Sequence, residues 1–280
     1  MILVTSANGH VGMKIVKAVA SRRLPVRAFG RAGDVGHDQK LSEVDYLEGD
    51  FFDLPTLRRA FDGVDQVFHI GPPENPGELA IGQAMIDLAA EFKVRQFVFF
   101  SVIHPYIAAL AHHRMKLLVQ QYLVDSGVPY TILQPTIFLQ TAGIEKILKG
   151  GTWTAPYSVD MPMSYVDLDD VAEAAIVILT EAKHLRATYE LVGTDPLSIR
   201  EMAASISNET GHEIKAEAIS PESIINHLPR TSVAEAYQAD DLEHMMVYYN
   251  RHGLTGNSYV LESLLKRKPN TLLEYLKKTT

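Results

Sequence analysis

The chain has no cysteine and one tryptophan among its 280 residues. Without Cys, disulfide bridges, thiolate nucleophiles and Cys-ligated metals are excluded. No apolar run is long enough to span a bilayer. Basic residues are outnumbered, 26 against 34 acidic, and the net charge of −8 argues against a nucleic-acid surface. We therefore expect a cytoplasmic protein with no membrane or nucleic-acid partner.

Two catalytic signatures are also missing. The eleven histidines include no H-E-x-x-H pair, so we expect no metal site. No G-x-S-x-G elbow indicates a serine hydrolase. Because the first apolar run already starts at Ile2, we expect no targeting peptide.

Apolar strand-like runs alternate with helical patterns in the first half, which predicts a doubly wound parallel α/β sheet of Rossmann type. The second half is less regular, and we expect it to form a small C-terminal substrate lobe. We place a dinucleotide-binding core at 1–150 and a mixed α/β lobe at 151–280 that completes the sheet and covers the substrate cleft. Predicted strands are 2–5, 25–29, 44–47, 66–70, 96–101, 130–133, 189–192 and 214–219; predicted helices are 11–20, 57–61, 78–92, 107–126, 137–148, 166–180 and 198–210, with further helices after Pro221.

The most informative segment follows the first predicted strand. Residues 5–12 read Thr-Ser-Ala-Asn-Gly-His-Val-Gly and lead into a helical pattern. A strand, a turn of small residues and a helix N-terminus together form a binding site for a dinucleotide pyrophosphate. The alternative is an ordinary turn between a strand and a helix.

Arg31 stands just after the second predicted strand, 19 residues beyond Gly12. A cation there favours NADP, because it can pair with the 2′-phosphate, whereas NAD sites carry an acid. The nearest acid along the chain is Asp34. The alternative is a solvated loop arginine. Asp50 and Phe51, after the third strand, are candidates for adenine contact or for a turn.

A candidate catalytic group follows the fifth strand. His112 and Lys116 are four residues apart, so on a helix they share one face. Lys can hold the nicotinamide ribose and His can deliver a proton near neutral pH. Ser101 can hydrogen-bond a carbonyl or hydroxyl of the substrate. The alternatives are a solvated helix face for this pair, and for His104 a turn residue or a substrate contact.

Several segments resemble, in order, the NmrA-like branch of the atypical short-chain dehydrogenases/reductases. The first loop is similar to T-G-A-T-G-x-x-G, with Ser6 in place of Gly. Residues 26–31 resemble the second strand with its NADP-selecting Arg, and 49–53 resemble the third-strand segment. Residues 126–135 resemble S-G-x-P-Y-T-I-L-R-P, with Gln134 in place of Arg. Residues 164–172 resemble V-D-x-x-D-V-A.

The resemblance implies one of two roles. Such proteins are NADPH-dependent reductases of quinones, dyes or aromatic carbonyl compounds, or non-catalytic redox-sensing regulators. His112 stands where related dehydrogenases carry the Tyr of Tyr-x-x-x-Lys. We expect a reductase of a small aromatic, quinone or conjugated carbonyl compound, with NADP(H) preferred over NAD(H). A sensor with a protein partner and a biosynthetic isomerase remain alternatives, and a homodimer stays open.

These expectations define a set of site residues. The catalytic candidates are Ser101, His112 and Lys116. The cofactor candidates are Thr5, Ser6, Asn8, Gly9, His10, Val11, Arg31, Asp50, Phe51, Gly71, Pro72, Lys116 and Pro135. The substrate candidates are His104, Phe138, Trp153 and Tyr165.

Overall fold

The computed structural model describes residues 1–31, 41–72 and 74–279. The chain divides into two compact units. The first contains Met1–Tyr106, His113–Gln134 and Ala172–Tyr189, and the second contains Ile107–His112, Pro135–Val171 and Glu190–Thr280. This division differs from a single boundary at residue 150, because the chain returns to the first unit at Ala172.

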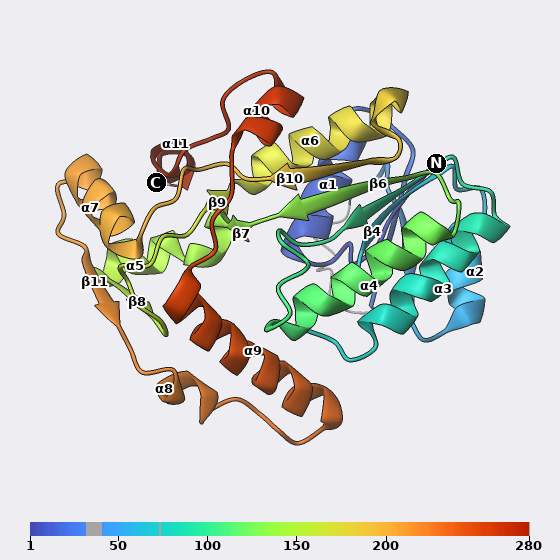
Figure 1. The fold of residues 1–280 in the computed structure, drawn as a ribbon. Helices are drawn as coiled ribbons and strands as arrows, with labels where there is room; N and C mark the ends of the chain where they lie inside the picture. Colours follow the sequence, from blue (N-terminus) through green and yellow to red (C-terminus); the bar gives the residue numbers. More distant parts are fainter. Residues whose placement is uncertain (32–40, 73, 280) are drawn as a thin grey trace. The chain divides into compact units, whose positions relative to one another are not determined.

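The predicted α/β sheet is confirmed. Within the described residues it has seven strands in the order β10-β6-β5-β4-β1-β2-β3, and the pairs from β6 to β3 are parallel (Figure 1). The central strands β4 and β5 are buried at every position, as strands covered on both faces must be. The strands are β1 Ile2–Val4, β2 Val26–Gly30, β3 Asp45–Glu48, β4 Gln66–Ile70, β5 Gln96–Phe100, β6 Tyr130–Pro135 and β10 Ala187–Leu191.

Helices cover both faces of this sheet. On one face lie α2 Leu54–Phe61, α3 Glu78–Glu91 and α4 Ala111–Asp125; on the other lie α1 His10–Ser21 and α6 Leu168–Thr180, which leads into the short η3 Ala182–His184 (Figure 1). A core cluster joins the first face to its helices, with Phe97 and Phe99 of β5 among side chains such as Met85 and Val119. Burying such large apolar side chains stabilises the sheet–helix layers.

Two buried glutamines lie at the starts of adjacent strands. Gln66 donates from Nε2 to Gln96 Oε1 at 2.7 Å and to the carbonyl of Leu179 at 2.8 Å. Gln96 in turn donates to Thr131 Oγ1 at 3.0 Å. Because each buried amide has partners, the polar groups strengthen the β4–β5–β6 register instead of weakening it.

The second unit contains two small parallel sheets, β7–β9 and β11–β8. Its strands are β7 Ile137–Phe138, β8 Thr152–Ala155, β9 Tyr165–Val166 and β11 Lys215–Ala218. Its helices are η2 Leu139–Ala142, α5 Ile144–Gly150, α7 Ile199–Thr210, α8 Glu222–Ile225, α9 Val233–His252, α10 Tyr259–Leu265 and α11 Leu272–Thr279. The predicted ends of α7 are confirmed: Ser198 and Glu201 form a capping box, and Gly211 ends the helix at φ 72°.

Two helix predictions were wrong in part. Residues 137–148 are not one helix, because the chain first pairs as β7 and then turns at Gly143, whose φ is 67°. The helix predicted from 107 begins at Ala111, where the side chain of Asp241 accepts the N–H groups of the first two residues. An acceptor at that point fixes a helix start.

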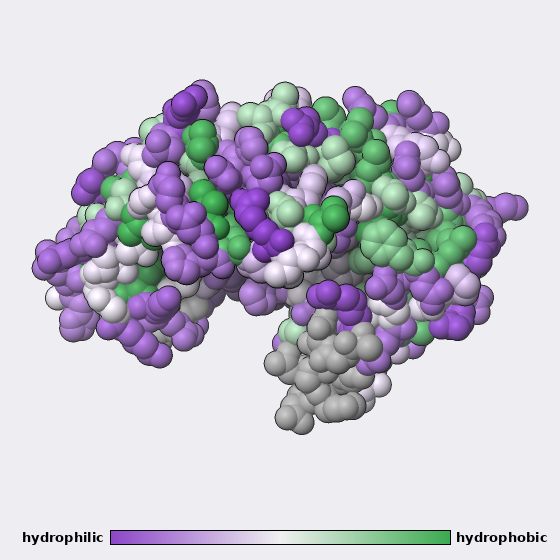
Figure 2. Space-filling model, turned by 90° about the horizontal axis from the view of Figure 1, so that it is seen from below, coloured by the Kyte–Doolittle hydropathy of each residue, from purple (hydrophilic) through white to green (hydrophobic). Residues whose placement is uncertain are grey.

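The surface agrees with the ordinary charged fraction of the sequence. The face drawn in Figure 2 mixes hydrophilic side chains with smaller groups of apolar ones. Among residues 1–31, 41–72 and 74–279, no helix is both long and apolar enough to cross a membrane.

Candidate functional site

The loop after β1 is tied to the end of β4 by two hydroxyl groups. Thr5 Oγ1 donates to the carbonyl of Ile70 at 3.1 Å and accepts its N–H at 2.9 Å. Ser6 Oγ donates to the same carbonyl at 2.8 Å, and Ser6 has φ 47°. The left-handed backbone explains why the resembling motif has Gly here. Both hydroxyls therefore hold the shape of the loop.

The two glycines of the loop have different surroundings. A Cβ on Gly12 would lie 2.2 Å from the carbonyl oxygen of Ser6, so Gly12 lets α1 pack directly on the loop. A Cβ on Gly9 would come no nearer than 3.4 Å to the same oxygen. Gly9 caps α1 without a side-chain hydrogen bond, and the first turn, from His10 and Val11, holds no acid. The backbone N–H groups of His10 and Val11, at this helix N-terminus, therefore suit an anion.

A small hollow lies beside the ends of β2 and β3. Asn8 Nδ2 donates to the carbonyl of Arg31 at 2.8 Å, and a Cβ on Gly30 would overlap the Asn8 side chain. The exposed Arg31 lines the hollow together with Glu48, which pairs in register with Gly30. The lining residues are Asn8, Ala28, Gly30, Arg31, Tyr46, Leu47 and Glu48.

Sequence reasoning missed Glu48. It is 17 positions from Arg31 along the chain, and only the β2–β3 pairing brings it to the hollow. Asp34, the acid nearest along the chain, lies outside the described residues. The hollow thus offers a cation for a phosphate and a carboxylate for a hydroxyl.

Asp50 and Phe51 form local structure after β3. Asp50 Oδ1 accepts the N–H of Phe52 at 2.8 Å, which is a turn of the Asx type. The Phe51 ring packs edge-on against Phe29 and His69, with centroids 5.5 and 5.9 Å apart. The turn alternative is therefore present, and adenine contact stays a prediction.

Lys116 is held in a buried ion pair that the sequence did not reveal. Its Nζ donates to Glu78 Oε1 at 2.5 Å and lies 5.8 Å from the centre of the Phe99 ring. Glu78 is the first residue of α3, and its carboxylate is 3.2 Å from where a Cβ of Gly71 would stand. Gly71 and Pro72 lead from β4 to this helix. Lys116, Glu78 and Gly71 are thus brought together in the first unit.

His69 lies on β4 in the same unit and stays neutral. Its Nδ1 is 3.0 Å from Thr5 Oγ1, and its ring stacks on Phe99. Burial, and next the positive charge of Lys116, lower the pKa of His69 from its ordinary 6.5 to about 3. A neutral imidazole at this position contributes to packing without adding charge to the site.

Ser101 heads a chain of buried polar side chains. Its Oγ accepts from Gln120 Nε2 at 2.5 Å, and Gln120 Oε1 accepts from Gln134 at 3.1 Å. Gln134 occupies the position where the resembling motif has Arg. Its side-chain amide, in place of a guanidinium, donates the hydrogen bond to Gln120. His104 has φ 49°, and its carbonyl accepts from His113 Nδ1 at 2.9 Å. His104 is thus a turn residue whose carbonyl holds His113, and a contact of its side chain with substrate stays a prediction.

His112 is bonded to a carboxylate from another helix. In the second unit, Asp241 Oδ2 lies 2.8 Å from His112 Nδ1, and Asp241 Oδ1 accepts the N–H groups of Ala111 and His112. Burial works to raise the pKa of the Asp241 carboxyl, but hydrogen bonds from His112 and Ala111 outweigh it and hold the pKa below its ordinary value. Asp241 was not among the sequence candidates.

The substrate candidates of the second unit lie on its short strands. Phe138 on β7 and Tyr165 on β9 are brought onto paired strands, where Phe138 faces Val166 in register. Trp153 is buried on β8. Burial raises the pKa of the Tyr165 phenol far above its ordinary value, and Tyr157 and Tyr249 raise it further. Pro135 ends β6.

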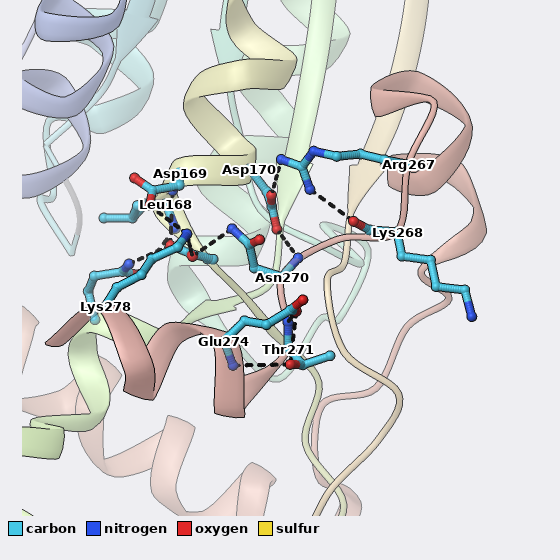
Figure 3. A network of polar contacts seen from close by, with 11 residues as sticks. Leu168, Asp169, Asp170, Arg267, Lys268, Asn270, Thr271, Glu274 and Lys278 are labelled. Atoms are coloured by element: carbon cyan, nitrogen blue, oxygen red, sulfur yellow. Dashed lines mark hydrogen bonds and ion pairs between the residues drawn. The ribbon is translucent and has the colours of Figure 1, made fainter. Parts of the chain in front are cut away.

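The carboxylates of the acidic segment at the start of α6 accept hydrogen bonds from residues in the C-terminal part of the chain (Figure 3). Asp170 accepts from Arg267 at 2.7 Å and from the N–H of Asn270 at 2.6 Å. Asp167 accepts from Gln140, Asn270 and Lys278. Burial raises the pKa of the Asp170 carboxyl, although Arg267 and Asn270 oppose it. The V-D-x-x-D-V-A segment thus fastens α6 to α11.

A doubly wound parallel sheet, with its glycine-containing loop between β1 and α1, defines an α/β protein of the Rossmann type. Residues 1–276 match the model of the NmrA-like family. The chain belongs to this family, and the resemblance noted from its motifs is confirmed.

Proteins similar to this chain include reductases and a transcriptional regulator. An NAD(P)H azoreductase of Xenophilus azovorans is 26% identical over 284 residues, covering 99% of this chain and 97% of its own. The Citrobacter triphenylmethane reductase complexed with NADP(H) superposes with a TM-score of 0.84 at 20% identity over the full length of both chains. NmrA, a negative transcriptional regulator, in complex with NADP has a TM-score of 0.77 at 17% identity, covering 99% and 94%.

Proposed function

We propose that this protein is an NADPH-dependent reductase of a small aromatic, quinone or conjugated carbonyl compound. The observation that carries the proposal is the first-unit arrangement of an open helix N-terminus, an arginine-lined hollow and a buried lysine. The azoreductase relative and the NADP(H)-bound reductase with the same fold support it. A cytoplasmic location and a homodimer remain predictions.

The residues present fit a dinucleotide. Gly12 leaves no room for a Cβ between α1 and the loop, and the N–H groups of His10 and Val11, next to the cap Gly9, suit a pyrophosphate. Arg31 would pair with the 2′-phosphate, and Asn8 supports its backbone. A bound reduced nicotinamide supplies a hydride, and this is the chemistry the cofactor adds.

The chain's own residues would orient and protonate the acceptor. Lys116, held by Glu78, would bind the nicotinamide ribose beside Gly71 and Pro72, and Pro135 is a further candidate for cofactor contact. Ser101 would hydrogen-bond the acceptor oxygen. His112 would deliver the proton, and substrate would be contacted by the candidates His104, Phe138, Trp153 and Tyr165.

A titration followed by a turnover assay tests the function. We expect NADPH to bind more tightly than NADH, and the absorbance of the reduced nicotinamide to fall when quinones, dyes or aromatic ketones are added. K116M should abolish turnover at a temperature where the variant is still folded, while NADPH binding, carried mainly by the first loop and Arg31, is weakened but kept. The exposed-helix variant K17M, on α1, is the matched control and should keep full turnover.

A non-catalytic sensor is the second candidate, since His112 occupies the place of the Tyr of related dehydrogenases and the NADP-bound regulator shares the fold. Tight NADPH binding by the wild type, with no oxidation by any acceptor, would favour the sensor. A protein partner should then be sought.

A further inference from the structure

We propose that Asp241 is the positioning residue that orients His112 as the proton donor, an inference that rests on the reductase function proposed above. Asp241 lies on α9 and is 2% exposed. A carboxylate buried to this degree is retained only where its oxygens are bonded.

Both oxygens of Asp241 bond to the same short segment. Oδ1 accepts the N–H of Ala111 at 3.1 Å and of His112 at 3.3 Å, while Oδ2 is 2.8 Å from His112 Nδ1. Capping α4 needs only the first oxygen. The second oxygen fixes the rotation of the imidazole ring, which a cap alone would leave undetermined.

The bond also decides which ring nitrogen exchanges a proton. With Nδ1–H donated to the carboxylate, Nε2 is the nitrogen that gives and recovers a proton, and the negative charge of Asp241 balances the ring when both nitrogens are protonated. The His112 side chain is 13% exposed, against 1% for Asp241. The His112 ring is therefore more accessible to solvent than the buried carboxylate that holds its Nδ1 side.

As a quinone takes up a hydride at one carbonyl oxygen, the ring electrons shift and the second carbonyl C=O becomes a C–O⁻ phenolate. Nε2 of protonated His112 gives its proton to this phenolate oxygen, so that the acceptor leaves as a hydroquinone. The ring, now neutral and still held by Asp241, recovers a proton from water.

The chain provides a matched control next to this residue. Asp240 is also on α9, but its side chain is exposed and faces His244 at 3.6 Å. D240N and D241N change the charge equally, at adjacent positions. Because Asn also caps helices well, D241N keeps an acceptor for the start of α4 while removing the carboxylate from the ring.

The experiment compares two kinds of acceptor in the full-length chain. Reduction of a quinone to a hydroquinone consumes one proton besides the hydride, whereas a cationic triphenylmethane dye consumes the hydride alone. We expect D241N to lower kcat for the quinone about 100-fold, the scale of general acid catalysis. KM, NADPH affinity and any dye reduction should stay unchanged, and D240N should match the wild type.

Nitrogen NMR of the His112 ring gives a readout that does not depend on turnover. The wild type should show a protonated, hydrogen-bonded Nδ1, and D241N should lose that signature. Quinone turnover that D241N retains would overturn the inference alone, as would an equal loss with both acceptors. A wild-type chain that binds NADPH but reduces no acceptor would overturn the proposed function, and the inference with it.

Discussion

Lys116 and Glu78 form an ion pair inside the first unit, with side chains that are 10% and 2% exposed. The two residues are 38 positions apart, on α4 and α3. The pair holds Lys116 beside the Phe99 ring. The position of the lysine side chain thus depends on a carboxylate that belongs to none of the sequence motifs.

Breaking this pair should destabilise the fold. K116M or E78Q leaves a buried charge without its counter-charge, which costs about 3–5 kcal/mol. In the double variant neither charge remains, so its loss should be smaller than the sum of the two. Urea denaturation of the four proteins measures the coupling. The exposed Arg58–Glu91 pair is the control, where E91Q should change the stability little because solvent screens both charges. Additive losses at Lys116 and Glu78 would contradict the prediction.

Cofactor preference should depend on both charges at the β2–β3 hollow. R31A removes the partner of the 2′-phosphate and should weaken NADPH binding by about 1.5–3 kcal/mol with little effect on NADH. E48Q should shift the ratio toward NADPH, since a carboxylate repels that phosphate. Calorimetric titration with both nucleotides measures the ratio, and R22A, at the exposed end of α1, should not change it. An unaltered ratio in R31A would refute the assignment.

The two glycines of the first loop should respond differently. G12A places a methyl group 2.2 Å from the Ser6 carbonyl oxygen, so α1 must shift, at about 1–3 kcal/mol or more of stability. G9A has room and should leave the melting temperature nearly unchanged, while it hinders the approach of the pyrophosphate. Thermal unfolding and NADPH titration of both variants separate packing from binding. Equal melting temperatures would show that α1 does not need the space at Gly12.

Acidification should destabilise the protein through His69. Its pKa is lowered to about 3 in the folded chain, by burial first and Lys116 second, and is 6.5 ordinarily. Between these values the unfolded chain binds a proton that the folded one does not, so the stability present above 6.5 is lost as pH falls toward 3. From pH 7 to 5 this group should cost about 2 kcal/mol. In H69Q the free energy of unfolding should fall less between pH 7 and pH 5 than in the wild type. Identical slopes of unfolding free energy against pH in the two proteins would refute the prediction.

The strands and the ends of α7 were predictable because their signals are local. Continuous apolar runs mark buried parallel strands, and the Ser198–Glu201 box and Gly211 lie within one turn of the helix ends they fix. The helix predicted over 137–148 was wrong because its apolar spacing suits a helix, whereas pairing with β9 and the turn at Gly143 decide the structure.

The polar partners of the candidate site could not be predicted for a different reason. Asp241 lies 129 residues from His112, and Glu48 reaches the hollow beside Arg31 only through strand pairing. Periodicity shows which face of an element is polar, but not which distant side chain will face it. The types of the candidate residues could be chosen from the sequence, and their partners required the fold.

The division of the chain has a consequence for how such a protein can change. The backbone passes between the two units after residues 106, 112, 134, 171 and 189. A recombination event that joins the front of one gene to the back of another makes a single junction, and no single junction separates these units. One junction can exchange only a part of the second unit, such as Glu190–Thr280, while its other segments stay with the first unit.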